Sequence, residues 1–162
     1  MPQTAPRLLA AFVLSCALLA TGCGASLIPN TDVEDSARNR EVVAFLESYR
    51  HAVEARDVRK LLSLASPRYL DHNGTTAGDD DIDLETLRTK IAALSSSVED
   101  VRFEIRYRRV AFHDDHILVD VTYTGSFRIG EPDGGHHWSR RLSDQRYVLE
   151  RAGDSFLIVS GM

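Results

Sequence analysis

The chain has 162 residues, a formal net charge of -5, 43% hydrophobic residues and 27% charged residues. This length suits one domain with one core, and the composition is that of a soluble globular protein. The negative charge argues against a nucleic-acid-binding protein, because such proteins carry positive charge that replaces phosphate counterions.

Residues 1–22 have the pattern of a signal peptide. An uncharged apolar run of thirteen residues extends from Leu8 to Ala20, which is shorter than the about 20 residues that span a bilayer. It ends in ATGC, which resembles the lipobox of bacterial lipoproteins, where small residues precede a cysteine that is lipidated and becomes the mature N-terminus. Here that cysteine is Cys23. The alternative is an ordinary secretory signal that leaves Cys23 as a free thiol.

The lipobox resemblance implies an anchor and a location. A lipid on Cys23 holds the protein to a membrane, and Gly24 stands where many lipoproteins retained in the inner membrane have aspartate. We therefore expect the protein on the periplasmic side of the outer membrane, with residues 23–39 as lipidated cysteine and tether. Cys16 lies in the removed segment, so the mature chain has no disulfide and no thiol left for catalysis.

Two helices are predicted between residues 31 and 67. The T-x-x-E spacing of Thr31 and Glu34 is that of a capping box and favours a helix start there. Asp57 ends that helix and N-caps a shorter one, which Pro67 stops. The apolar positions of the first helix follow the three-and-four spacing of one buried face: Val42, Phe45, Leu46, Tyr49, Ala52 and Val53.

A short strand, a polar loop and a third helix come next. Residues 69–71 have strand character, and the loop that follows contains the acidic run from Asp79 to Asp83. Its oxygen ligands suit a hard cation such as calcium, but the helix dipole alone favours negative charge before a helix. The helix is predicted over residues 84–95 with Asp83 as its N-cap. Its buried face is predicted to contain Leu84, Leu87, Ile91 and Leu94.

After residue 100 the hydrophobic period changes from that of a helix to that of a strand. Apolar and charged residues alternate from Val101 to Tyr107, and the next apolar residues are out of phase, which predicts a bulge near Arg108-Arg109. Turns rich in Gly, Asp and His separate three later predicted strands, at residues 117–129, 138–150 and 156–160. Four consecutive hairpin-linked strands after three helices predict an α+β fold.

The order of these elements resembles the NTF2-like superfamily, which includes ketosteroid isomerase and SnoaL-type cyclases. The resemblance covers residues 40–162. It rests on the element order, on Tyr49 and Asp57 in a Y-x7-D spacing, and on the closing FLIVSGM. It implies a cone in which three N-terminal helices pack into a curved antiparallel sheet of four to five strands, with a pocket between helices and sheet.

The resemblance implies two alternative functions. One is a non-catalytic domain that binds a small apolar ligand or a protein partner, and that forms a homodimer through its sheet as relatives often do. The other is an isomerase, cyclase or hydrolase in which Tyr49 supplies a phenol, Asp144 a protonated acid and Asp71 the base. Counting from Asp57 without gaps reaches Asn73, and only a shift of two residues brings Asp71 to the base position. The non-catalytic function is therefore preferred.

A pocket of this kind is expected to be bordered by aromatic and acidic side chains. The candidates are Tyr49, Tyr69, Tyr107, Tyr123 and Asp144. Four histidines lie in predicted turns, without the HExxH or cysteine spacing of a metal site, so neither a metal nor a cofactor is expected. They are His113, His116, His136 and His137.

Overall fold

The structure is a computed structural model, and it describes residues 26–74, 78, 80–131 and 133–162. The signal peptide predicted at residues 1–22, the lipidation site at Cys23 and Asp79 of the acidic loop lie outside the described residues. In the part of the chain that is described, no helix has the length and apolar character needed to cross a membrane.

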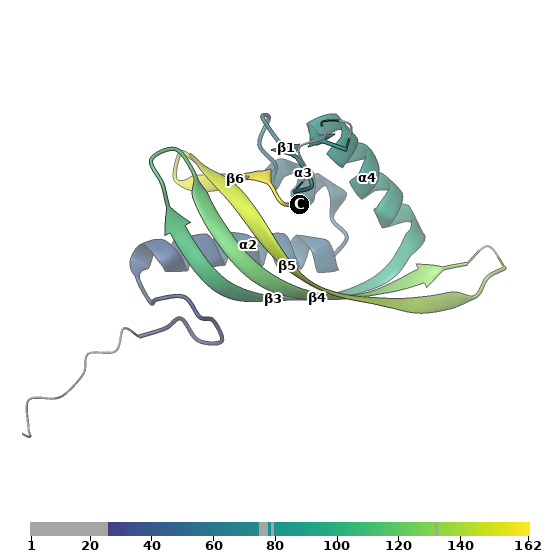
Figure 1. Ribbon diagram of the computed structural model, residues 1–162. Coiled ribbons are helices and arrows are strands. Elements are labelled where there is room, and N and C mark those ends of the chain that lie inside the picture. Colours follow the sequence, from purple (N-terminus) through teal and green to yellow (C-terminus); the bar gives the residue numbers. More distant parts are fainter. Residues whose placement is uncertain (1–25, 75–77, 79, 132) are drawn as a thin grey trace, which may run out of the picture.

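The described residues fold into three helices and two antiparallel sheets (Figure 1). The helices are α2 (Ala37–Glu54), α3 (Val58–Leu64) and α4 (Leu84–Ser97). The small sheet pairs β1 (Leu70–Asp71) with β2 (Ile82–Asp83). The large sheet contains, in sequential order, β3 (Val98–Phe112), β4 (Ile117–Gly130), β5 (His136–Ala152) and β6 (Ser155–Ser160). The predicted meander and the α+β fold class are confirmed.

Short polar side chains cap each helix, as the sequence predicts for two of them. The backbone N–H of Lys60 donates to Asp57 over 3.0 Å, and that of Thr86 donates to Asp83 over 2.8 Å. Both predicted N-caps are thereby confirmed. The predicted helix start at Thr31 is wrong, because α2 begins at Ala37 and is capped by Ser36.

The segment before α2 packs against the sheet. Thr31 closes a turn there, since its hydroxyl donates to the carbonyl of Ile28 over 2.9 Å and accepts the N–H of Val33 over 3.1 Å. The backbone N–H of Asp32 donates to the carbonyl of Tyr107 on β3 over 2.9 Å. Because Val33 is also buried, tertiary contacts set the conformation of this segment and override the local capping-box pattern.

The large sheet is curved, and the helices lie on its concave side (Figure 1). The register between β3 and β4 shifts between Tyr107 and Arg109, which confirms the predicted bulge. β5 pairs with β4 along nearly its whole length, but β6 covers only its last residues from Val148. The stretch of β5 from His136 to Tyr147 therefore borders β4 on one side only.

The core lies where α2 crosses the concave face. Val42 and Leu46 of α2 and Leu149 and Ile158 of the sheet all have exposed fractions of 0%. Burying such a side chain fully contributes about 1.5–3 kcal/mol relative to leaving it exposed. This contact fixes α2 on the sheet and thereby fixes the position of Tyr49, which lies on the same face of the helix.

Candidate functional site

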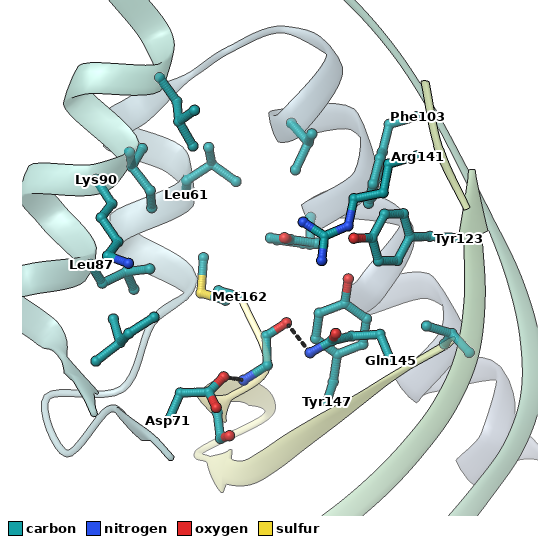
Figure 2. A pocket seen from close by; sticks show the side chains of 18 of the residues that line it. Leu61, Asp71, Leu87, Lys90, Phe103, Tyr123, Arg141, Gln145, Tyr147 and Met162 are labelled. Carbon is teal, nitrogen blue, oxygen red and sulfur yellow. Dashed lines mark hydrogen bonds between the residues drawn. The ribbon is translucent and has the colours of Figure 1, made fainter. Parts of the chain in front are cut away.

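A cavity of about 1370 Å³ lies between the sheet and the helices (Figure 2). One wall is formed by inward-facing side chains of β3, β4 and β5 together with Tyr49 of α2. The opposite wall is formed by side chains of α3 and α4, and Met162 at the chain's end borders it as well. Ligand pockets commonly have volumes of about 300–1,000 Å³. This cavity exceeds that range and is large enough for a drug-sized molecule.

The sheet wall is aromatic. Tyr49 meets Tyr147 with ring centroids 5.4 Å apart and Phe103 with centroids 6.4 Å apart, both edge to face. Phe103 in turn lies 5.3 Å from Tyr123. Such pairs favour a fixed relative orientation of the rings. Figure 2 shows the hydroxyls of Tyr123 and Tyr147 directed toward the cavity, so the wall combines apolar rings with polar hydroxyl groups.

Burial keeps the deepest of these phenols neutral. It raises the pKa of Tyr49 to about 12, although a hydrogen bond with Tyr147 acts in the opposite direction. Burial also raises the pKa of Tyr147 well above its usual value. At neutral pH both side chains are therefore hydrogen-bonding groups, and neither is a base.

The helix wall is mainly apolar. Leu61 of α3 and Leu87 of α4 are buried, whereas Leu94 at the far end of α4 is 61% exposed. The predicted buried face of α4 therefore faces the cavity, and only Leu87 of this stripe is buried. The reason is geometric, because α4 stands over the cavity instead of lying against the sheet (Figure 1).

Asp71, the candidate base, borders the cavity but holds the chain's last residues in place (Figure 2). One carboxylate oxygen accepts the backbone N–H of Gly161 over 2.8 Å, and the other accepts that of Asn73 over 2.9 Å. The carbonyl of Gly161 accepts the side-chain amide of Gln145 over 3.2 Å. A carboxylate engaged in this way is a structural acceptor, and proton abstraction would compete with these contacts.

Asp144, the candidate acid, faces away from Tyr49. Alternation along β5 places Gln145 and Tyr147 on the inner face of the sheet and Asp144 on the outer face. The Asp144 carboxylate borders the hollow only from that outer side, where it is exposed and accepts the hydroxyl of Thr122 over 2.7 Å. The catalytic set of Tyr49, Asp71 and Asp144 is therefore not brought together.

Two other candidate tyrosines are buried elsewhere. The hydroxyl of Tyr107 donates to Glu47 of α2 over 2.8 Å. The hydroxyl of Tyr69 accepts the backbone N–H of Met162 over 3.0 Å. Burial raises the pKa of each. Both serve to join elements, and of the proposed tyrosines only Tyr49 and Tyr123 border the cavity.

The histidines and the acidic loop form no metal site in the described residues, where no group of three or more His, Cys, Asp or Glu side chains is placed to hold an ion. His113 and His116 stack at 4.7 Å between ring centroids in the β3–β4 turn. In the acidic loop, Asp81 contacts His72 over 2.8 Å and Asp83 caps α4. Each of these residues thus has a local structural role.

Several further side chains border the cavity and were not among the sequence candidates, and the polar ones include Lys90, Arg141, Gln145 and Tyr147. Lys90 comes from α4, and the others come from the inner face of β5. The period-two pattern that runs back from the buried Leu149 through Tyr147 to Arg141 was present in the sequence and would have identified the three residues of β5.

Comparison of the sequence with protein-family models and with curated proteins gives no match. Solved structures do share the fold. A candidate dehydratase of the NTF2-like family from Streptomyces avermitilis is 18% identical with a TM-score of 0.58, and the match covers 76% of this chain and 92% of that one. A candidate scytalone dehydratase from Novosphingobium aromaticivorans is 6% identical with a TM-score of 0.65, over 76% of this chain and 80% of that one.

A third similar structure is Bd1075 from Bdellovibrio bacteriovorus, with 17% identity and a TM-score of 0.60. The match covers 77% of this chain but only 40% of Bd1075, so this chain spans less than half of that protein. Together these likenesses establish the class to which the structure belongs. The fold is NTF2-like, a cone with a cavity between its helices and its curved sheet.

Proposed function

We propose that this protein is a lipid-anchored, periplasmic NTF2-like domain that binds a small, largely apolar ligand in its cavity. The observation that carries the proposal is the cavity itself, with an apolar helix wall facing an aromatic sheet wall. Small-molecule sites are concave, mainly apolar and provided with a few polar groups that orient the ligand. The hydroxyls of Tyr49, Tyr123 and Tyr147 are suited to that orienting role.

A binding function is better supported than catalysis. Two of the similar structures have names that make them candidate dehydratases, and dehydration or isomerisation needs an acid or a base beside the substrate. Here Asp71 is engaged by two backbone N–H groups and Asp144 lies on the outer face of the sheet. The phenols are neutral donors, which suit ligand orientation more than proton abstraction.

The proposed anchor at Cys23 would hold the domain close to the bilayer. Only three residue steps separate Cys23 from Ser26, where the described structure begins, and such a segment reaches about 10 Å at most. Since the segment before α2 packs on β3, the lipid and the folded domain would be neighbours. Metabolic labelling with a fatty acid, compared between wild type and Cys23→Ser, tests the anchor, and outer-membrane fractionation tests the location.

The binding proposal is tested with the mature chain carrying Cys23→Ser, which needs no detergent. The uncharged dye Nile red is expected to bind with a rise in fluorescence. Leu94→Trp, which introduces a larger side chain into the cavity, should abolish binding. Leu70→Trp is the matched control, because Leu70 is also an exposed leucine but does not border the cavity. Equal loss in both variants, or no dye binding in wild type, would refute the proposal.

Native mass spectrometry of the same protein adds two independent observations. A copurified small molecule would support an occupied cavity, and its mass would identify the ligand. The spectrum also gives the oligomeric state, which tests the expected homodimer. Exposed Trp138 and Leu142 lie on the outer face of β5, so Leu142→Arg is expected to dissociate a dimer formed through that face.

A further inference from the structure

The cavity has a positive lining in a negative protein. On the inner side of the sheet three bordering side chains are cations and one is a carboxylate, which leaves an excess of two positive charges, whereas the whole chain has a formal net charge of -5. The cations are Arg56, Lys90 and Arg141, and the carboxylate is Asp71. Arg108, Asp120, Asp144 and Arg146 border the hollow only from the outer face. Such local charge favours a ligand of opposite sign.

Two of these cations reach the cavity from opposite walls (Figure 2). Lys90 comes from α4 and Arg141 from β5, and neither takes part in the ion pairs of the described residues. The third cation, Arg56, donates to the carbonyl of Val98 over 2.5 Å. On the outer face, Arg146 pairs with Asp120 and Arg108 with Asp32. Lys90 and Arg141 are thus the cations left available to a ligand.

The register of the sheet explains why Arg141 reaches inward. Arg141 pairs with Gly125 on β4, and Gly125 pairs with Phe103 on β3, so all three positions lie on the inner face. The ring of Phe127 covers the position of Gly125, 2.6 Å from where a Cβ would stand. Figure 2 shows the guanidinium of Arg141 directed into the cavity on the side of Phe103 and Tyr123. A planar guanidinium beside an aromatic wall is well suited to bind a carboxylate through two parallel hydrogen bonds.

We infer that the ligand is an amphipathic carboxylate, the class that includes fatty acids and aromatic carboxylic acids. Its apolar body contacts Leu87, Leu94 and Met162 on the helix side and the aromatic rings on the sheet side. Its carboxylate is bound by Arg141, and the ammonium of Lys90 on the opposite wall adds a longer-range attraction for the same charge. The inference rests on the proposed function, because it specifies the charge of the ligand that the same cavity binds.

The test compares an anion with its neutral counterpart. The mature chain carrying Cys23→Ser is titrated calorimetrically with laurate and lauryl alcohol, and with naphthoate and naphthol. The carboxylates are expected to bind more tightly than the alcohols. Lys90→Gln and Arg141→Gln should each weaken carboxylate binding roughly threefold or more, and the double variant roughly tenfold, with the alcohols unaffected. Added salt should reduce the preference for the carboxylates.

Matched controls separate a specific site from general charge. Arg140→Gln removes the same charge from the neighbouring residue on the outer face of β5, and Lys60→Gln does so on α3. Both side chains are exposed and do not border the cavity. Equal effects of the control and test variants would overturn the inference.

The two proposals fail in different ways. If acids and alcohols bind equally, the inference about charge is overturned while the cavity's binding function stands. If neither binds and Nile red also fails to bind, both are overturned. If Nile red binds but none of the four probes does, only the inference is overturned.

Discussion

The two ends of the sheet's inner face differ in what covers them. Under α2 the face is dry, since Leu46 and Leu149 both have exposed fractions of 0%. Under α4 the same strands border the cavity, and Leu94 of that helix is 61% exposed. The inward alternation of β5 thus gives a core residue at Leu149 and a cavity cation at Arg141. A helix in contact with the sheet makes a core, and a helix held away from it makes a binding site.

The difference between the two ends is tested most directly by replacing one leucine with alanine at each end. Leu46→Ala is expected to lower the free energy of unfolding by about 2–5 kcal/mol, because it leaves a cavity in a close-packed region. Leu94→Ala removes the same atoms from an exposed side chain and should change stability by about 0.5 kcal/mol or less. Urea unfolding measures both. Equal costs would mean that α4 packs as closely as α2 does.

A second substitution tests how tightly Gly161 is held between the two ends of the sheet's inner face. Gly161 has φ of +103°, and a Cβ there would lie 2.3 Å from the carbonyl oxygen of Arg146. Its N–H also donates to Asp71. Gly161→Ala should therefore cost more than about 1–2 kcal/mol, the penalty for a left-handed backbone conformation alone.

Gly153→Ala is the matched control for this prediction. Gly153 has φ of +61°, but nothing lies within 4 Å of a Cβ built there. Thermal unfolding should give a smaller loss for Gly153→Ala than for Gly161→Ala. If the two losses are equal, the contact with Arg146 does not constrain the end of the chain.

The third prediction concerns Glu150 of β5, a carboxylate that joins this strand to the segment after α3. Glu150 accepts the hydroxyl of Ser66 over 2.5 Å and pairs with Arg68, and its side chain is 14% exposed. The bond from Ser66, and then the contact with Arg68, hold the pKa of Glu150 below its usual value. Glu150→Gln should cost about 1 kcal/mol at neutral pH. Asp144→Asn, an exposed control on the outer face of β5, should cost about 0.5 kcal/mol or less.

The lowered pKa of Glu150 gives this prediction a pH dependence. The folded pKa lies below the unfolded one, so the stabilisation is complete above the unfolded pKa and is lost as pH falls through the folded pKa. Wild type should therefore lose more stability on acidification below the ordinary carboxylate range than Glu150→Gln does. Parallel loss in both proteins would show that the contacts of Glu150 contribute nothing to acid stability.

Features set by local chemistry were predictable from the sequence. The N-caps Asp57 and Asp83 depend on residues three positions away, and the bulge near Arg109 follows from a change of hydrophobic phase. The strand order follows from short turns between alternating segments. Features set by distant contacts were not predictable in this way. Thr31 has the spacing of a capping box, but its segment pairs with Tyr107 on β3, which no local pattern reveals.

The site could be predicted only in part, for two physical reasons. One is that a residue's face in a strand depends on a register accurate to one residue. Asp144 faces outward, whereas Gln145 beside it faces inward. The other is that similar side chains on the same face of the sheet are buried in the core or border the cavity, depending on which helix covers them. Tyr107 donates to Glu47 of α2 and is part of the core, whereas Tyr123 on the neighbouring strand meets Phe103 and borders the cavity.

The smallest expected effect at neutral pH comes from the phenol at the junction of the two ends. Tyr49 is buried in the core and borders the cavity, and its hydroxyl forms a hydrogen bond with Tyr147. Tyr49→Phe should lower the free energy of unfolding by about 0.5 kcal/mol there, the low end for one neutral hydrogen bond, because the ring contacts with Tyr147 and Phe103 are retained. In alkali the effect grows. The folded pKa of about 12 exceeds the unfolded value of about 10.

Because of this raised pKa, the titration of Tyr49 reports whether the close packing under α2 extends as far as its hydroxyl. Its stabilisation is complete below pH about 10 and is lost as pH rises toward about 12, so wild type should lose more stability in alkali than Tyr49→Phe. The difference in phenolate absorbance between the two proteins, titrated with base, should appear near pH 12. A difference that appears near pH about 10 would mean that water reaches the hydroxyl freely, and the open region would then extend to α2 itself.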